Sequence, residues 1–109
     1  METRKRRVIS CNIGGKDLFR YWLNALTDSA GVAAILQRLD RIEGGNFGDY
    51  RSLGGGLCEL RVHCGPGYRV YLGEDGPLVV ILLCGGDKKS QHKDIRLARS
   101  LWQGYRRGK

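Results

Sequence analysis

The sequence predicts an α+β fold in which a mostly antiparallel sheet carries a helical hairpin on one face. Residues 57–64 and 68–72 alternate between apolar and polar side chains, which is typical of strands with one buried face. Residues 78–83 are apolar at every position, which favours a central strand covered on both faces. Three further segments show helical spacing of apolar residues. The expected order is β-α-α-β-β-β-α, within a single domain over residues 1–109.

The N-terminal part is expected to supply the first strand and the first helix. Residues 6–13 are the strand candidate, and residues 1–6 are expected to be frayed. Asp17 is suited to an N-cap. The helix after it is predicted by apolar residues three and four apart: Leu18, Phe19, Trp22, Leu23 and Leu26.

A second helix is predicted after a short connection, so that the two helices form an antiparallel hairpin. Either Asp28 or Ser29 can cap it, and Gly44-Gly45 is its expected end. Its apolar stripe consists of Ala30, Ala33, Ala34, Leu36, Leu39 and Ile42, widened by Val32 and Ile35.

The C-terminal part is expected to hold the rest of the sheet and a last helix. A short strand at residues 50–53 precedes a β-hairpin whose turn is Gly65-Pro66-Gly67. An Asp75-Gly76 turn leads into the apolar strand. Ser90 can cap the last helix, whose buried stripe is Ile95, Ala98, Leu101, Trp102 and Tyr105.

Charge indicates the kind of partner. The chain has 19 Lys and Arg against 11 Asp and Glu, a formal net charge of +8. This balance favours an anionic partner, with nucleic acid first and an acidic protein second. No apolar run reaches the ~18 residues of a membrane span, and no apolar signal segment follows the basic N-terminus. We therefore expect a cytoplasmic protein with no membrane partner.

The cysteines and histidines do not predict a metal site. No two cysteines are spaced as C-x-x-C, and the chain has only two histidines, His63 and His92. Reduced cysteines in the protein core are expected at Cys58, Cys64 and Cys84. No cofactor is expected.

The polar face of the β-hairpin is the candidate functional surface. Alternation places Cys58, Leu60, Val62 and Cys64 on one face, and Tyr68, Val70 and Leu72 on the same face of the next strand. The opposite face then carries Arg61, His63, Arg69 and Tyr71. Two guanidiniums, an imidazole and a phenol suit a phosphodiester. Arg61 can alternatively pair with Glu59, its neighbour on that face.

Two segments resemble the addiction-module killer proteins, which are HigB-like toxins of the RelE/ParE superfamily. They read NFGDYRSLGGGLCELRVHCGPGYRVYL at residues 46–72 and LLCGGDKKSQHKDIRLARSLW at residues 82–102. The resemblance extends from about Phe19 to Tyr105. It implies a small RelE-like fold and a toxin neutralised by a cognate helix-turn-helix antitoxin. Members of the RelE branch cut mRNA in the ribosomal A site without a metal, whereas the ParE branch inhibits DNA gyrase.

The resemblance also implies roles for residues of this chain. Arg69 matches the arginine that RelE-type toxins use on the phosphate, and Lys88 and Lys89 match a basic loop at the site's border. Arg61 can supply a second guanidinium fork, and His63 is the candidate for proton transfer because its ordinary pKa lies near neutrality. RelE toxins have a tyrosine where this chain reads residues 91–95, so His92 is the candidate to replace it.

Other residues are expected to bind RNA rather than to act in the chemistry. Tyr71 is a candidate for stacking on a base. Asp94 is expected to complete the rim of the RNA site, together with His92. The candidates for contacts with RNA phosphates are Arg38, Arg41, Arg96 and Arg99, with Arg106, Arg107 and Lys109 near the C-terminus. An acidic segment of the antitoxin could cover the same surface.

Three functional classes remain open at this point. The first is a ribosome-dependent mRNA endoribonuclease that inhibits translation. The second is a ParE-like toxin that inhibits gyrase and is not a nuclease. The third is an inactive antitoxin-binding or RNA-binding module. Fold alone cannot choose among them, because the site carries the chemistry.

Overall fold

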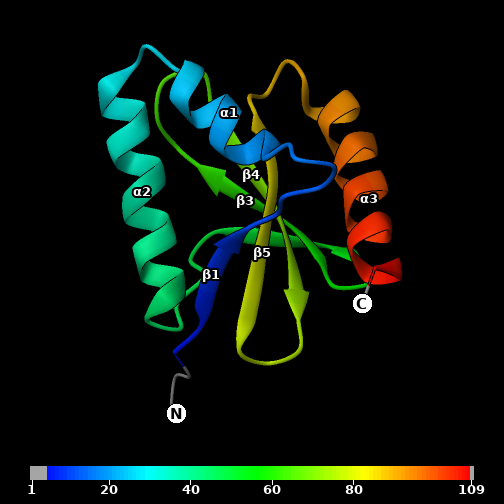
Figure 1. Ribbon diagram of the computed structural model, residues 1–109. Coiled ribbons are helices and arrows are strands. Elements are labelled where there is room, and N and C mark those ends of the chain that lie inside the picture. Colours follow the sequence, from blue (N-terminus) through cyan, green and yellow to red (C-terminus); the bar gives the residue numbers. More distant parts are fainter. Residues whose placement is uncertain (1–4, 109) are drawn as a thin grey trace.

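Five strands form one mixed sheet in the computed structural model, which describes residues 5–108 (Figure 1). The spatial order is β1-β5-β4-β3-β2, with β1 parallel to β5 and all other pairs antiparallel. The strands are β1 Arg7–Ser10, β2 Tyr50–Gly54, β3 Leu57–Val62, β4 Tyr68–Asp75 and β5 Val79–Gly86. The mostly antiparallel sheet is confirmed. The short strand expected at residues 50–53 is present as β2, at the edge of the sheet. The expected order β-α-α-β-β-β-α was nevertheless wrong, because it counts one strand too few.

Three helices cover the two faces of this sheet (Figure 1). Helices α1 (Leu18–Ala25) and α2 (Ser29–Glu43) lie on one face, and α3 (Gln91–Arg107) lies on the other. The α+β class, with an N-terminal helix pair and a C-terminal helix, is confirmed. Among residues 5–108, none of the helices combines the length and apolar character that a membrane crossing requires.

The helix starts follow the capping residues closely. The Asp17 carboxylate accepts from the Arg20 backbone N–H at 3.0 Å, as predicted for α1. For α2 the cap is Asp28, which accepts from the Gly31 N–H at 3.0 Å. Ser90 occupies the N-cap position of α3, but its side chain makes no cap hydrogen bond and instead donates to the Asp94 carboxylate.

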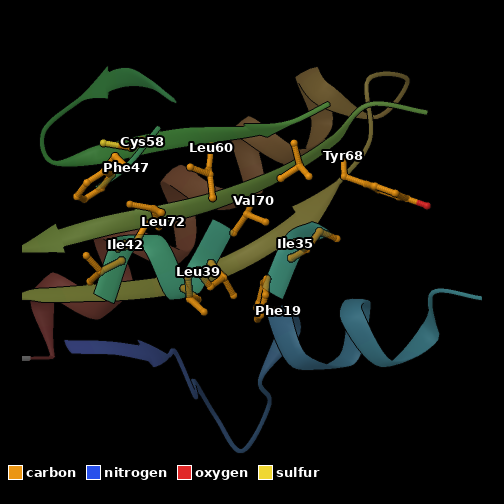
Figure 2. Close-up of a cluster of buried hydrophobic side chains, with 13 residues drawn as sticks. Phe19, Ile35, Leu39, Ile42, Phe47, Cys58, Leu60, Tyr68, Val70 and Leu72 are labelled. Atoms are coloured by element: carbon orange, nitrogen blue, oxygen red, sulfur yellow. The ribbon is translucent and has the colours of Figure 1, made fainter. Parts of the chain in front are cut away.

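Alternation along the strands sorts side chains into two cores. The core beneath α1 and α2 takes Cys58, Leu60, Val62, Tyr68, Val70 and Leu72 from β3 and β4, as predicted (Figure 2). The core beneath α3 contains Leu57, Tyr71, Ile81, Leu83, Cys84, Ala98 and Trp102. Strand β5 contributes to both cores, which confirms that it is covered on both faces. The second face of the hairpin is therefore covered over much of its length rather than open.

An ordered arginine, Arg6, directly precedes the first strand. The Arg6 backbone N–H donates to the Glu43 carbonyl at 2.9 Å, and its guanidinium donates to Glu74 at 3.2 Å. The same guanidinium lies 4.8 Å from the centroid of the Phe47 ring. The prediction that residues 1–6 are frayed is therefore wrong for Arg6, whereas residues 1–4 lie outside the described residues.

All four cysteines are free thiols, and residues 5–108 contain no cluster of metal-ligating side chains. Cys58 and Cys84 are buried, as predicted. Cys64 is only half-buried, because β3 ends at Val62 and Cys64 lies in the turn beyond it. Burial raises the pKa of Cys58 to about 11 and that of Cys84 to about 12, from an ordinary value of 9.0.

Stability is expected to fall in alkali. Both buried thiols hold their protons more tightly in the folded chain than in the unfolded one. Their contribution to the free energy of unfolding is therefore fully present below pH 9. This contribution is lost as the pH rises from 9 toward 12. Thermal melts across this window should show a falling midpoint, and Cys84→Ala should flatten the decline. A native melting temperature that stays constant from pH 9 to 11 would contradict the burial of these thiols.

Candidate functional site

A fully buried carboxylate lies at the centre of the polar hairpin face. Glu59 in β3 is 0% exposed and pairs across the strands with Tyr71 of β4. The Tyr71 hydroxyl donates to Glu59 Oε2 at 3.1 Å, and Gln91 Nε2, at the start of α3, donates to the same oxygen at 2.9 Å. Strand pairing and the third helix together hold this carboxylate in place.

Three guanidiniums surround Glu59, and we call Glu59, Arg51, Arg61 and Arg69 the arginine cluster. Arg61 Nε lies 3.3 Å and Arg51 Nη2 3.5 Å from Oε1, and Arg69 Nε lies 3.8 Å from Oε2. Arg61 and Arg69 are direct partners in the β3–β4 register. The sequence prediction that these two arginines lie side by side is confirmed. One carboxylate does not neutralise three guanidiniums, so the cluster retains positive charge.

Glu59 is ionised despite its burial. Burial alone raises the pKa of a carboxyl group. Here hydrogen bonds from Gln91, Tyr71 and Arg61, together with the charge of Arg51, outweigh burial and lower the pKa of Glu59 below its ordinary value. Burial and the adjacent Glu59 carboxylate raise the pKa of Tyr71, which therefore remains a neutral donor.

Tyr71 is buried and cannot reach an RNA base in this structure. Its side chain is 0% exposed, because α3 covers this part of the sheet. The prediction of a stacking tyrosine is therefore wrong, since alternation gives the face of a residue but not what lies over it. Tyr71 instead contributes a hydrogen bond to the arginine cluster.

Arg69 lies beneath the hairpin turn. Its side chain is 13% exposed, and Nη1 donates to the Gly67 carbonyl at 2.9 Å. Gly67 has a positive φ of 81°, and a Cβ there would lie 3.5 Å from Arg69 Nη1 and 3.8 Å from the Cβ of Lys88. The turn therefore folds over Arg69 and brings the exposed Lys88 to the rim of the arginine cluster.

His63 lies just past the end of β3, on the outer edge of the hairpin. Its imidazole is 76% exposed, and Nε2 makes a hydrogen bond with the Asp49 carboxylate. That hydrogen bond lowers the pKa of Asp49. The structure thus gives the predicted proton-transfer residue a carboxylate partner, which orients the ring.

Arg38 fastens the loop that carries Asp49. Its guanidinium donates to the carbonyls of Phe47 at 2.9 Å and Asp49 at 3.0 Å, and also to the Arg61 carbonyl. Gly48, with a φ of 67°, lies directly against this guanidinium. Backbone carbonyls take up donors of Arg38, which gives this residue a structural role, and its contact with RNA stays a prediction.

Arg38→Ala is expected to destabilise the fold by about 2 kcal/mol, because three carbonyl acceptors lose a charged donor. Arg41→Ala is the matched control, since Arg41 is exposed on the same helix. It should stay within about 0.5 kcal/mol of the native protein. Chemical denaturation of both variants measures the difference. Equal stabilities of the two variants would rule out this role for Arg38.

The remaining candidates lie around α3. Lys89 and His92 are exposed near its start, with Lys88. Asp94 is only 7% exposed and accepts from the Ser90 hydroxyl, so the prediction that it binds RNA is wrong. The exposed arginines of the two long helices are Arg41, Arg96, Arg99, Arg106 and Arg107. Arg106 also donates to the Gly55 carbonyl at 3.1 Å. Lys109 lies outside the described residues.

Sequence reasoning missed four residues of this site: Arg51, Asp49, Gln91 and the role of Glu59 as its centre. One signal was present for Glu59, because it is an acidic residue within a strand that is otherwise mostly apolar and lies on the same face as Arg61. Gln91 and Asp49 come from other elements, so the pattern of the hairpin could not reveal them.

The fold and the site define an α+β protein whose sheet holds a buried carboxylate among arginines. Over 85 residues the chain is 48% identical to a protein of Haemophilus influenzae described as uncharacterized, covering 78% of this chain and 86% of that protein. The chain belongs to the same family as that protein. No family model and no solved structure matches the chain.

Proposed function

We propose that this protein is the toxin of a type II toxin–antitoxin system and that it inhibits translation by cutting mRNA on the ribosome. The observation that carries the proposal is the arginine cluster. Arg61 and Arg69 are paired across the hairpin in it, and the cluster has more positive than negative charge. The resemblance of residues 46–72 and 82–102 to RelE-type toxins supplies the expected substrate. The RelE-like arrangement of the fold is part of the same proposal.

The residues present suit cleavage by the ribose 2′-OH. Attack of that hydroxyl on the adjacent phosphorus breaks the bond to the 5′ oxygen of the next nucleotide and leaves a 2′,3′-cyclic phosphate. Charge that develops on the non-bridging oxygens is met by Arg61 and Arg69, whose guanidinium forks match two oxygens at once. The Lys88 ammonium adds positive charge at the rim.

Proton transfer is assigned to His63, held by Asp49. A base must take the proton of the 2′-OH and an acid must protonate the leaving 5′ oxygen. An imidazole can act as the base or as the acid at neutral pH. The hydrogen bond to the Asp49 carboxylate orients the His63 ring. Glu59 is unsuited to this step, because it is buried and its pKa is lowered.

The proposed partners are a cognate helix-turn-helix antitoxin, the ribosome and its mRNA. An acidic antitoxin segment placed over Arg61, Arg69 and Lys88 would block the site both sterically and electrostatically. The exposed arginines of α3 are proposed to contact ribosomal RNA phosphates, which fixes orientation without reading sequence.

Induction of the protein alone in a bacterial host tests this function. We expect growth arrest and new RNA ends inside reading frames. A copy of the same transcript without its start codon should remain uncut, because it carries no translating ribosome. Growth arrest in which the mRNA stays intact and the DNA is broken would instead indicate a gyrase inhibitor. Unimpaired growth of cells that contain the folded protein would indicate an inactive binding module.

A further inference from the structure

Both oxygens of Glu59 are fully engaged. Oε1 faces Arg51 and Arg61, and Oε2 faces Arg69, Tyr71 and Gln91. The donors come from β2, β3, β4 and α3, so a single carboxylate joins three strands of the sheet to the third helix. With 0% of the residue exposed, no substrate reaches this carboxylate.

Arg61 and Arg69 make their closest contacts with Glu59 through Nε. These contacts leave terminal amino groups of each guanidinium for other acceptors, and one of them, Nη1 of Arg69, donates to Gly67. Arg61 Nε donates a hydrogen bond to Oε1, whereas Arg69 Nε faces Oε2 as a buried ion pair without a hydrogen bond. The two guanidiniums thus face neighbouring oxygens of one carboxylate, and a phosphodiester likewise offers two neighbouring non-bridging oxygens.

We propose that Glu59 is a positioning residue that holds Arg61 and Arg69 at the spacing needed for the two non-bridging oxygens of an RNA phosphodiester. The inference rests on the function proposed above and deepens it. Tyr71 and Gln91 support this positioning indirectly, because their hydrogen bonds keep the Glu59 carboxylate in place and ionised. Catalytic contact belongs to the arginines, and Glu59 acts through them.

A positioning role predicts that turnover falls while the binding of RNA is not weakened. Glu59→Gln removes one negative charge beside three guanidiniums, which strengthens the general attraction for RNA. It also releases Arg61 and Arg69 from their fixed spacing. With purified protein and ribosomes programmed with a defined mRNA, kcat should fall at least tenfold while KM stays unchanged or decreases. A residue that only stabilised the fold would lower the apparent kcat in proportion to the folded fraction, so kcat is expressed per folded molecule, with the folded fraction measured by circular dichroism. A tenfold loss that persists after this correction supports positioning.

A second measurement observes the side chains of Arg61 and Arg69 directly by nuclear magnetic resonance. In ¹⁵N-labelled native protein the Nε–H signals of Arg61 and Arg69 should be sharp and protected from exchange, and in Glu59→Gln they should broaden or vanish. This measurement needs no RNA. If the native protein cuts no mRNA, the proposed function fails, and the arginine signals alone decide whether Glu59 orders the pair.

The matched control is Glu74→Gln, which also removes a carboxylate paired with an arginine, here Arg6 at 3.2 Å. It should keep native kcat and native Arg61 and Arg69 signals. If Glu59→Gln does not fold, Glu59→Asp retains the charge but shortens the side chain, and a loss of kcat in that variant supports positioning. A folded Glu59→Gln variant with native kcat and sharp arginine signals would overturn the proposal, as would native kcat in Glu59→Asp.

Discussion

Arg69→Ala should abolish mRNA cleavage by this protein without unfolding it. Arg69 combines a place beside Glu59 with a guanidinium that is only 13% exposed and held under the hairpin turn by Gly67. Removing a preorganised donor from developing transition-state charge typically costs about 100-fold or more in rate. Because Arg51 and Arg61 still neutralise Glu59, the fold should survive the substitution.

Two further variants sharpen this prediction. Arg69→Lys keeps the charge but loses the fork, so it should recover only a small part of the native rate. Arg96→Ala removes an exposed arginine from the outer surface of α3, and it should retain cleavage far above that of Arg69→Ala. Cleavage products are counted by primer extension, and folding is followed by circular dichroism. Native cleavage by a folded Arg69→Ala variant would disprove the assignment of the site.

Gly73→Ala is expected to have the largest effect on stability. The indole of Trp102 in α3 lies directly on Gly73 in β4, so that a Cβ at this position would overlap the ring. Trp102 is itself 5% exposed and anchored by a hydrogen bond from Nε1 to the Gly55 carbonyl at 2.8 Å. Because the ring cannot withdraw without breaking this bond, overpacking should cost about 3 kcal/mol. Urea denaturation measures the change in the free energy of unfolding.

The control for Gly73 is a glycine with room beside it. Gly104 lies in the last turn of α3, where a Cβ would contact only the Ile13 side chain, at 4.0 Å. Gly104→Ala should therefore stabilise the protein, by up to about 1 kcal/mol, through helix propensity. If Gly73→Ala proved as stable as Gly104→Ala, the contact between Trp102 and β4 would be incorrectly described.

Local patterns were sufficient to predict the elements and the two faces of the hairpin. A strand has a period of two, so Leu60 and Val70 could be assigned to one core and Arg61 and Arg69 to the other face from spacing alone. Asp17 and Asp28 cap their helices by contacts within three residues, which a sequence displays directly. The paired arginines are the part of the site that such local rules could identify.

The rest of the site depends on which elements meet in space. Periodicity predicted α3 but not where it lies, so the burial of Tyr71 by this helix could not be foreseen. Gln91 reaches Glu59 across 32 positions of the chain, and Arg38 reaches the carbonyl of Arg61 across 23. A basic residue on a helix looks the same in sequence whether it faces RNA or a neighbouring loop.

The most direct test of the account is cleavage by the purified protein on ribosomes whose A site holds a known codon. We expect a single cut within that codon, absent from the same mRNA without ribosomes and absent with Arg69→Ala. Uncut mRNA on programmed ribosomes, at protein concentrations equal to those of the ribosomes, would contradict the claim that the Arg61–Arg69 face cleaves mRNA.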